Sequence, residues 1–186
     1  MRSFLKVMRP AVFFLIVMTV LCGVLYTGVI TGIAQLLFPS QANGSMVTVT
    51  ADGGAKQVYG SQLIEQTFSE PQYLIGRPMT VSNLSPDSAE QLQIVGQRVE
   101  WLRGMDPGNS TDIPADLVTA SGSGVDPYIS AAAAEYQAAR IANARGMSED
   151  QVLAIIEKYT EGRFLGFVGE PVVNVLMVNL ALDGKI

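Results

Sequence analysis

Residues 114–130 contain the side chains of this chain that come closest to a reactive site. Ser121, Gly122, Ser123 and Gly124 form a run without bulk, and Asp126 follows just before Pro127. A serine hydroxyl becomes a nucleophile when a neighbouring base removes its proton. The chain has no histidine, so a Ser-His-Asp triad cannot form.

Two weaker uses of this run remain open. Ser121 or Ser123 could pair with Lys158 as a Ser-Lys dyad, although no spacing in the sequence indicates it. The backbone N–H groups of the same run could bind an anion. A structural turn is the favoured interpretation, since Asp before Pro usually orders a turn.

Other catalytic and metal-binding patterns are missing. The single cysteine, Cys22, lies in an apolar run, so Cys/His metal sites lack ligands. Neither an EF-hand loop nor a phosphate-binding P-loop occurs. We therefore expect no catalytic residue, no metal ligand and no directly bound cofactor. A site-like loop without reactive partners indicates a protein that serves another protein.

The N-terminal region predicts a membrane span. Residues 11–38 carry no charge over 28 positions, and about 20 apolar residues cross a bilayer as a helix. We place the crossing at residues 13–36. A cleaved signal peptide is the alternative, because residues 40–42 resemble a cleavage site, but its apolar core spans only roughly 7–15 residues.

Charge predicts the orientation of the span. Arg2, Lys6 and Arg9 precede it, and the next basic residue is Lys56. Because basic residues flank the cytoplasmic side, residues 1–12 should be cytoplasmic. Residues 37–45 then form a linker, and residues 46–186 form a domain outside the cytoplasm. This domain holds all 17 acidic residues against 12 − 3 = 9 basic ones, a net charge of −8, which argues against nucleic-acid binding.

The span also carries a possible packing face. Gly28 and Gly32 form a G-x-x-x-G pattern, which lets a second helix approach closely. Gln35 lies near the same face and can form a hydrogen bond across helices. The alternative is chance, because glycine is frequent in membrane helices.

Periodicity and turn residues predict an α+β domain. We expect a strand at 46–50, a turn at 52–54, a short helix at 60–68 and a buried strand at 172–182 that contains Asn174 and Asn179. We also expect a helix from 85 to 104, whose inward residues are Leu92, Val95, Val99 and Leu102, and a helix from 130 to 145 that ends at Gly146. A further helix should run from the Ser148–Gln151 capping box to about 162, with Val152, Ile155 and Ile156 inward.

Several motifs together resemble one family. They are GSQLIEQTF (60–68), YLIGRP (73–78), SNLSP (82–86), PADLVTASGSGVDPYIS (114–130), YQAARIANARG (136–146) and GRFLGFVGEPVVNVLMVNLALD (162–183). With the N-terminal span, their order resembles the KdpC subunit of the bacterial Kdp potassium-transporting ATPase. The family usually has Gly at Glu65, His at Tyr128 and Pro at Ala131.

The resemblance implies an accessory role in a cell-membrane complex. Its partners would be a potassium-channel-like subunit and a P-type ATPase subunit, which handle potassium and ATP. The family is described as a catalytic chaperone that raises the ATPase subunit's affinity for ATP. We expect partner contacts at Gly28, Gly32 and Gln35, at the 121–126 loop and within residues 166–174, which include Glu170 and Asn174. A membrane-anchored external serine hydrolase and a sensor or adhesion domain are the alternatives.

Overall fold

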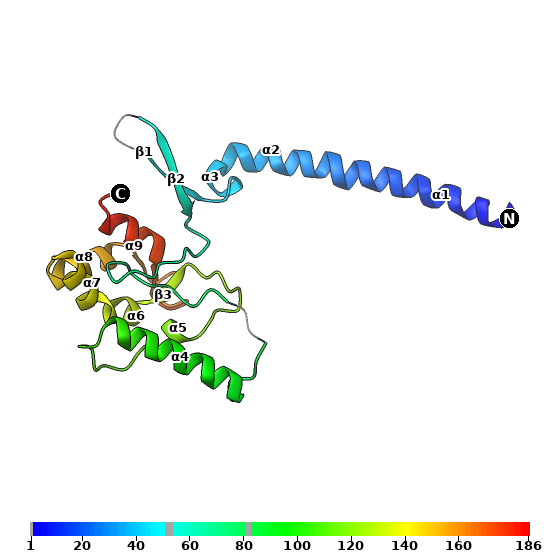
Figure 1. Ribbon diagram of the computed structural model, residues 1–186. Helices are drawn as coiled ribbons and strands as arrows, with labels where there is room; N and C mark the ends of the chain where they lie inside the picture. The colour runs from blue at the N-terminus through cyan, green and yellow to red at the C-terminus, as the bar shows by residue number, and fades with distance from the viewer. Residues whose placement is uncertain (1, 51–53, 81–82) are drawn as a thin grey trace. The chain divides into compact units, whose positions relative to one another are not determined.

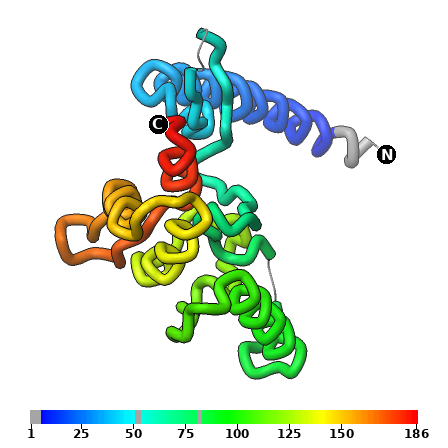
Figure 2. Tube along the Cα trace, turned by 60° about the vertical axis from the view of Figure 1, so that its left-hand side comes forward, coloured from blue at the N-terminus to red at the C-terminus, as the bar shows by residue number. Residues whose placement is uncertain are grey.

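The computed structural model describes residues 2–50, 54–80 and 83–186 (Figures 1 and 2). It consists of two compact units, Met1–Met46 and Val47–Ile186, which we describe separately. Residues 52 and 53 of the predicted turn lie outside the described residues.

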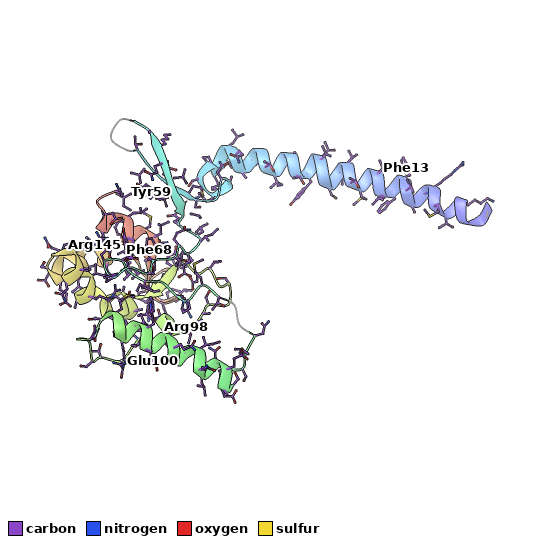
Figure 3. All side chains as sticks on the ribbon, viewed as in Figure 1. Phe13, Tyr59, Phe68, Arg98, Glu100 and Arg145 are labelled. Carbon is purple, nitrogen blue, oxygen red and sulfur yellow. The ribbon has the colours of Figure 1, made fainter. Side chains whose placement is uncertain are left out.

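The first unit is helical. It contains α1 (Arg2–Met18), the π-helical segment η1 (Thr19–Tyr26), α2 (Thr27–Leu37) and the short α3 (Pro39–Ala42). Within the described residues, one helical stretch, Lys6–Leu37, is long and apolar enough to cross a membrane. Its apolar side chains, such as Phe13, are exposed and do not pack into a core of the described residues (Figure 3). The part expected to be a linker thus includes a helical turn, which Pro39 begins because proline suits the first helical position.

The second unit combines small sheets with helices, as the α+β prediction expected. Strands β1 (Met46–Thr50) and β2 (Lys56–Ser61) form one sheet. A second, antiparallel sheet has the order β3 (Tyr128–Ser130), β5 (Val172–Asn174), β4 (Thr160–Glu161). Ile129 lies opposite Val173 in this sheet, and both side chains are fully buried.

Six helices complete the described part of this unit: α4 (Ala89–Met105), α5 (Ala115–Val118), α6 (Ala131–Tyr136), α7 (Ala138–Arg145), α8 (Glu149–Lys158) and α9 (Val175–Leu182). Alanines of α6 and α7 pack with Val152 and Ile156 of α8 and with Val178 of α9. Val95 and Val99 of α4 pack against this core, and Leu102 belongs to it, whereas Leu92 is exposed. Three of the four predicted inward residues of α4 are therefore confirmed.

Two predicted helix boundaries in the second unit are confirmed. The capping box is formed as expected: Ser148 Oγ accepts from the Gln151 N–H, and Gln151 Oε1 accepts from the Ser148 N–H. Gly146 ends α7 with a left-handed φ of 66°. The helix predicted from the capping box to about residue 162 stops at Lys158, earlier than expected, because strand β4 follows at Thr160.

Three other predictions are wrong. Residues 60–68 form the end of β2 and a coil, since Gly60 has a φ of 145° that a right-handed helix excludes. Helix α4 begins at Ala89, because Ser88 rather than Ser85 caps it by accepting from the Gln91 N–H. The helix expected at 130–145 breaks at Gln137, whose N–H bonds to the Ala134 carbonyl three residues before it.

The predicted strand at 172–182 is also wrong beyond its first residues. Asn174 Oδ1 accepts from the Met177 N–H and starts α9. Most residues of α9 are buried, so the segment is apolar on nearly every side and has no helical periodicity to read.

Two side-chain amides hold a coil segment, residues 71–75, against the helices. Asn179 accepts from the Leu74 N–H (2.7 Å) and donates to the Leu74 carbonyl (2.8 Å). Gln137 does the same for Ile75, at 2.9 and 3.1 Å. These bonds satisfy the buried backbone of a segment that pairs with no strand in the described part of the chain.

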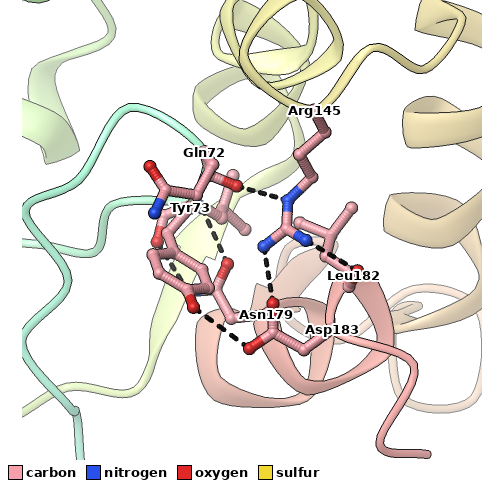
Figure 4. A network of polar contacts seen from close by, with 7 residues as sticks. Gln72, Tyr73, Arg145, Asn179, Leu182 and Asp183 are labelled. Carbon is pink, nitrogen blue, oxygen red and sulfur yellow. Dashed lines mark hydrogen bonds and ion pairs between the residues drawn. The ribbon is translucent and has the colours of Figure 1, made fainter.

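Two arginines of α7 complete the set of side chains that hold residues 71–75, which we call the clamp. Arg140 donates to the Pro71 and Tyr73 carbonyls. Arg145 donates to the Gln72 carbonyl and pairs with Asp183 at 2.8 Å (Figure 4). The clamp fixes the segment that leads directly to Gly76 and Arg77 of the candidate site.

Candidate functional site

The loop at residues 121–124 folds onto its own serines. Ser121 Oγ accepts from the Gly124 N–H at 2.9 Å, and Ser123 Oγ accepts from the Val125 N–H at 3.3 Å. The two hydroxyl oxygens lie 3.2 Å apart. Gly124 has a φ of 72°, which favours glycine. The N–H groups of Gly124 and Val125 are therefore satisfied inside the loop, which corresponds to the predicted structural turn.

The end of the loop is also ordered locally. Asp126 Oδ1 accepts from the Tyr128 N–H at 3.1 Å, the turn expected of Asp before Pro. Lys158 lies over the ring of Tyr159, 4.9 Å from its centroid. In the described part of the chain, no hydrogen bond joins Lys158 to Ser121 or Ser123, so the geometry gives no support to a Ser-Lys dyad.

Residues from distant segments anchor the loop on both sides. Arg98 of α4 donates to the Val118 carbonyl at 2.8 Å, on the side of the helix that faces the domain (Figure 3). Arg77 donates to the Ala120 carbonyl at 3.4 Å. After the loop, the Glu65 N–H donates to the Val125 carbonyl at 3.0 Å.

Glu65 is the unusual residue of this cluster. It is only 4% exposed, and its Oε2 has no hydrogen-bond partner among the residues that the structure describes. The pKa of Glu65 is raised from 4.5 to about 7: burial is the largest cause, the Asp126 charge also raises it, and Arg77 lowers it. Its Oε1 lies 2.3 Å from where a Cβ would stand on Gly76, so glycine at 76 makes room for this carboxyl.

A small cavity of about 220 Å³ adjoins Glu65. Its wall combines apolar and basic side chains: Phe68, Ile75, Arg77, Met79, Arg98 and Trp101. Both arginines already donate to backbone carbonyls, and Glu65 Oε2 is sealed from solvent. The cavity is therefore a packing feature of the loop's support.

Two other predicted contact residues lie at different places in the domain. Asn174 is buried: it caps α9, and its Nδ2 donates to the Gln62 carbonyl at 2.8 Å, so its role is structural. Glu170 is exposed and pairs with Arg163 at 3.0 Å. The fold therefore buries one of these two residues and exposes the other, although both belong to one predicted segment.

The predicted residues of the span belong to the first unit. A Cβ added to Gly28 or Gly32 would meet no atom within 4 Å, so both positions are open to a neighbouring helix. Gln35 and Asn43 exchange hydrogen bonds through their side-chain amides, at 3.3 and 3.0 Å. The polar group of Gln35 is thus paired within the chain.

Sequence reasoning missed the supporting residues Glu65, Arg77 and Arg98. Glu65 departs from the glycine that the family usually has at this position, and that departure is the signal that the sequence offers. The two arginines gave none, because a carbonyl partner 20 or 43 residues away leaves no periodic mark.

The site offers structure rather than reactive groups. Both loop serines bond within the loop, and no group of three potential metal-ligating residues occurs in the described ranges. The arrangement can present a rigid loop surface to a partner.

Comparisons with known proteins identify the family of this chain. The family model for KdpC, "K+-transporting ATPase, c chain", matches residues 8–184. A "Potassium-transporting ATPase KdpC subunit" of Listeria monocytogenes is 50% identical over 98% of both chains. Those of Methylococcus capsulatus and Clostridium perfringens are 48% and 47% identical, over 94% and 97% of this chain and 96% and 98% of theirs. This chain belongs to the KdpC family of K⁺-transporting ATPase subunits.

Proposed function

We propose that the chain is a non-catalytic accessory subunit needed for assembly and activity of the ATP-driven potassium-transport complex. Family membership over nearly the full chain is the observation that carries this proposal. The geometry of residues 121–126 supports it, since both serine hydroxyls serve the loop's own backbone. The partners are the channel-like subunit and the P-type ATPase subunit.

The proposed topology has residues 1–12 in the cytoplasm, a span at 13–36 and the domain from 46 onward outside. The basic residues before the span and the net charge of −8 after it support this orientation. ATP is cytoplasmic, so direct contact between this domain and nucleotide would require crossing the bilayer. Any effect on ATP affinity is then a coupling between distant sites of the complex.

Co-purification tests the accessory role. A C-terminally tagged chain is purified in mild detergent from potassium-starved cells, and its partners and ATPase activity are measured. We expect a channel-like protein, a P-type ATPase and potassium-stimulated hydrolysis in the eluate. A chain that elutes alone would refute the proposal and favour the sensor or adhesion alternative.

A serine-directed probe tests the remaining enzymatic alternative. We expect the purified chain to stay unlabelled, because both loop hydroxyls lack a base in the described structure. Labelling that disappears in Ser121→Ala or Ser123→Ala would instead establish a hydrolase.

The orientation is tested with one introduced thiol. Cys22→Ser removes the natural cysteine, and Ile186→Cys places a new one at the end of the domain. We expect a membrane-impermeant thiol reagent to label intact cells once any outer membrane is made permeable. Labelling that requires rupture of the cytoplasmic membrane would place the domain inside and remove the coupling argument.

The glycine face is tested separately. Gly28→Leu with Gly32→Leu should abolish co-purification of partners, because the side chains fill the groove that a second helix would use. Both positions are open within the chain, so its own fold should not change. Val29→Leu with Ile33→Leu, which also enlarges or reshapes exposed side chains, is the control. Normal assembly of the glycine variant would exclude a packing role for this face.

A further inference from the structure

Residues 163–170 present an exposed apolar tip. Phe164 and Leu165 are each 71% exposed, Phe167 is 73% exposed and Val168 is 48% exposed. The segment connects β4 to β5 and is the orange loop at the left of Figure 2. Four neighbouring apolar side chains that leave the core at one turn are typical of an interaction site.

The tip has a fixed shape. The Phe164 N–H donates to the Val168 carbonyl at 2.9 Å, and the Val168 N–H donates to the Phe164 carbonyl at 3.0 Å. The Arg163–Glu170 ion pair lies at the base of the turn. A tip that is ordered before contact loses little conformational entropy on binding.

The backbone at the tip is strained. Leu165 has a φ of 53°, which few residues other than glycine adopt; among the described residues, Ser45 is the other non-glycine with a positive φ. Leu165 is mostly exposed, so no core packing compensates for the strain. Strain kept at an exposed apolar turn points to a function for its shape.

The exposed apolar area of the tip is too small for a stable dimer formed only by the tips of two copies of this chain. Two phenylalanines with a leucine and a valine offer on the order of 400 Å² per chain, because a phenylalanine buries about 150–250 Å². Two such tips would bury about 800 Å² in total, whereas stable interfaces bury about 1,200–2,000 Å². The tip therefore suits an anchor within a larger interface.

The charges around the tip argue against binding to a lipid surface. Loops and helices that bind bilayers combine apolar residues with a basic face. Here Arg163 is neutralised by Glu170, Glu161 lies nearby in β4, and the part of the chain after the span carries −8. An uncharged protein pocket matches the tip better.

We propose that Phe164 and Phe167 insert into an apolar pocket on the extracytoplasmic face of another subunit of the potassium-transport complex. This inference rests on the proposed function, and it assigns the docking element of the domain to the 163–170 turn.

A paired variant tests the anchor in the full complex. Phe164→Ala with Phe167→Ala should make the subunit dissociate at least tenfold faster from the purified complex in detergent. Leu63→Ala with Leu92→Ala, which also shortens two exposed apolar side chains, is the control and should not change the rate. Both variants should keep the melting temperature of the isolated chain, since all four side chains are largely exposed.

A photo-crosslinking amino acid at position 167 identifies the occupant. Crosslinks to the channel-like or ATPase subunit, identified by mass spectrometry, would support the proposal. Crosslinks to lipid alone, to a second copy alone or to nothing would overturn it. If the unmodified chain recovers no complex, the proposed function fails; if it does and the Phe164/Phe167 variant dissociates at the normal rate, only the anchor fails.

Discussion

Replacing Glu65 by glutamine should make the protein more stable at alkaline pH. The folded state holds this carboxyl with a pKa of about 7, against 4.5 for an ordinary glutamate. Between these values the folded chain binds more protons than the unfolded chain, so this group lowers stability as pH rises. Glutamine has no proton to lose there and avoids the penalty.

The magnitude follows from the two pKa values. The difference between 4.5 and about 7 corresponds to about 3 kcal/mol at about 1.36 kcal/mol per pH unit. The stability of Glu65→Gln minus that of the natural chain should therefore be constant below pH 4.5. It should then rise by up to about 3 kcal/mol by pH 8, an increase in melting temperature of about 6–12 °C for a chain of this size.

The assay is thermal and urea unfolding of the detergent-solubilised chain at pH values from 4 to 8.5. Taking the difference between variant and natural chain removes the titration of all other groups. Glu100→Gln, an exposed substitution on α4, is the control for the removal of a carboxylate. A flat difference for Glu65→Gln would show that its carboxyl finds solvent or a partner, and the burial argument would fail.

Two further changes test how the same region is held. Gly76→Ala should destabilise the chain by about 1–3 kcal/mol, because its Cβ would stand 2.3 Å from Glu65 Oε1. In a double-mutant cycle, adding Glu65→Gly should recover most of that loss of stability. Additive effects of the two substitutions would disprove the contact. Asn179→Ala should cost about 2–5 kcal/mol in urea unfolding, since it leaves the buried N–H and carbonyl of Leu74 without partners; a loss under 1 kcal/mol would show that water or a shifted backbone replaces the amide.

Local signals in the sequence predicted the features that depend on nearby residues. The Ser148–Gln151 capping box, the Gly146 helix end and the strand at Met46–Thr50 each follow from residues within one turn or strand. The apolar N-terminal helix follows from composition alone. The turn at 121–126 also followed from small residues and Asp before Pro.

Features that depend on distant partners could not be predicted in this way. Asn179 reads as a polar interruption of a strand until Leu74, 105 residues earlier, supplies its partner. The sequence marks Glu65 as a departure from the family pattern, but only the fold shows that its carboxyl is buried beside Gly76 and near Asp126. Helix α9 was hidden because burial on most sides removes the polar face that reveals a helix.

The clamp on residues 71–75 sets an order for folding during synthesis. This segment is made before every residue that binds it: Gln137, Arg140 and Arg145 follow 62 to 73 positions later, and Asn179 comes near the end of the chain. Residues 71–75 therefore lack their full set of partners until more than half of the domain has been synthesised after them. Their docking is a late, long-range step that completes only with the C-terminus. A nascent chain halted before α9 would lack the Asn179 contacts, so proteases should cleave this coil more readily than in the finished chain.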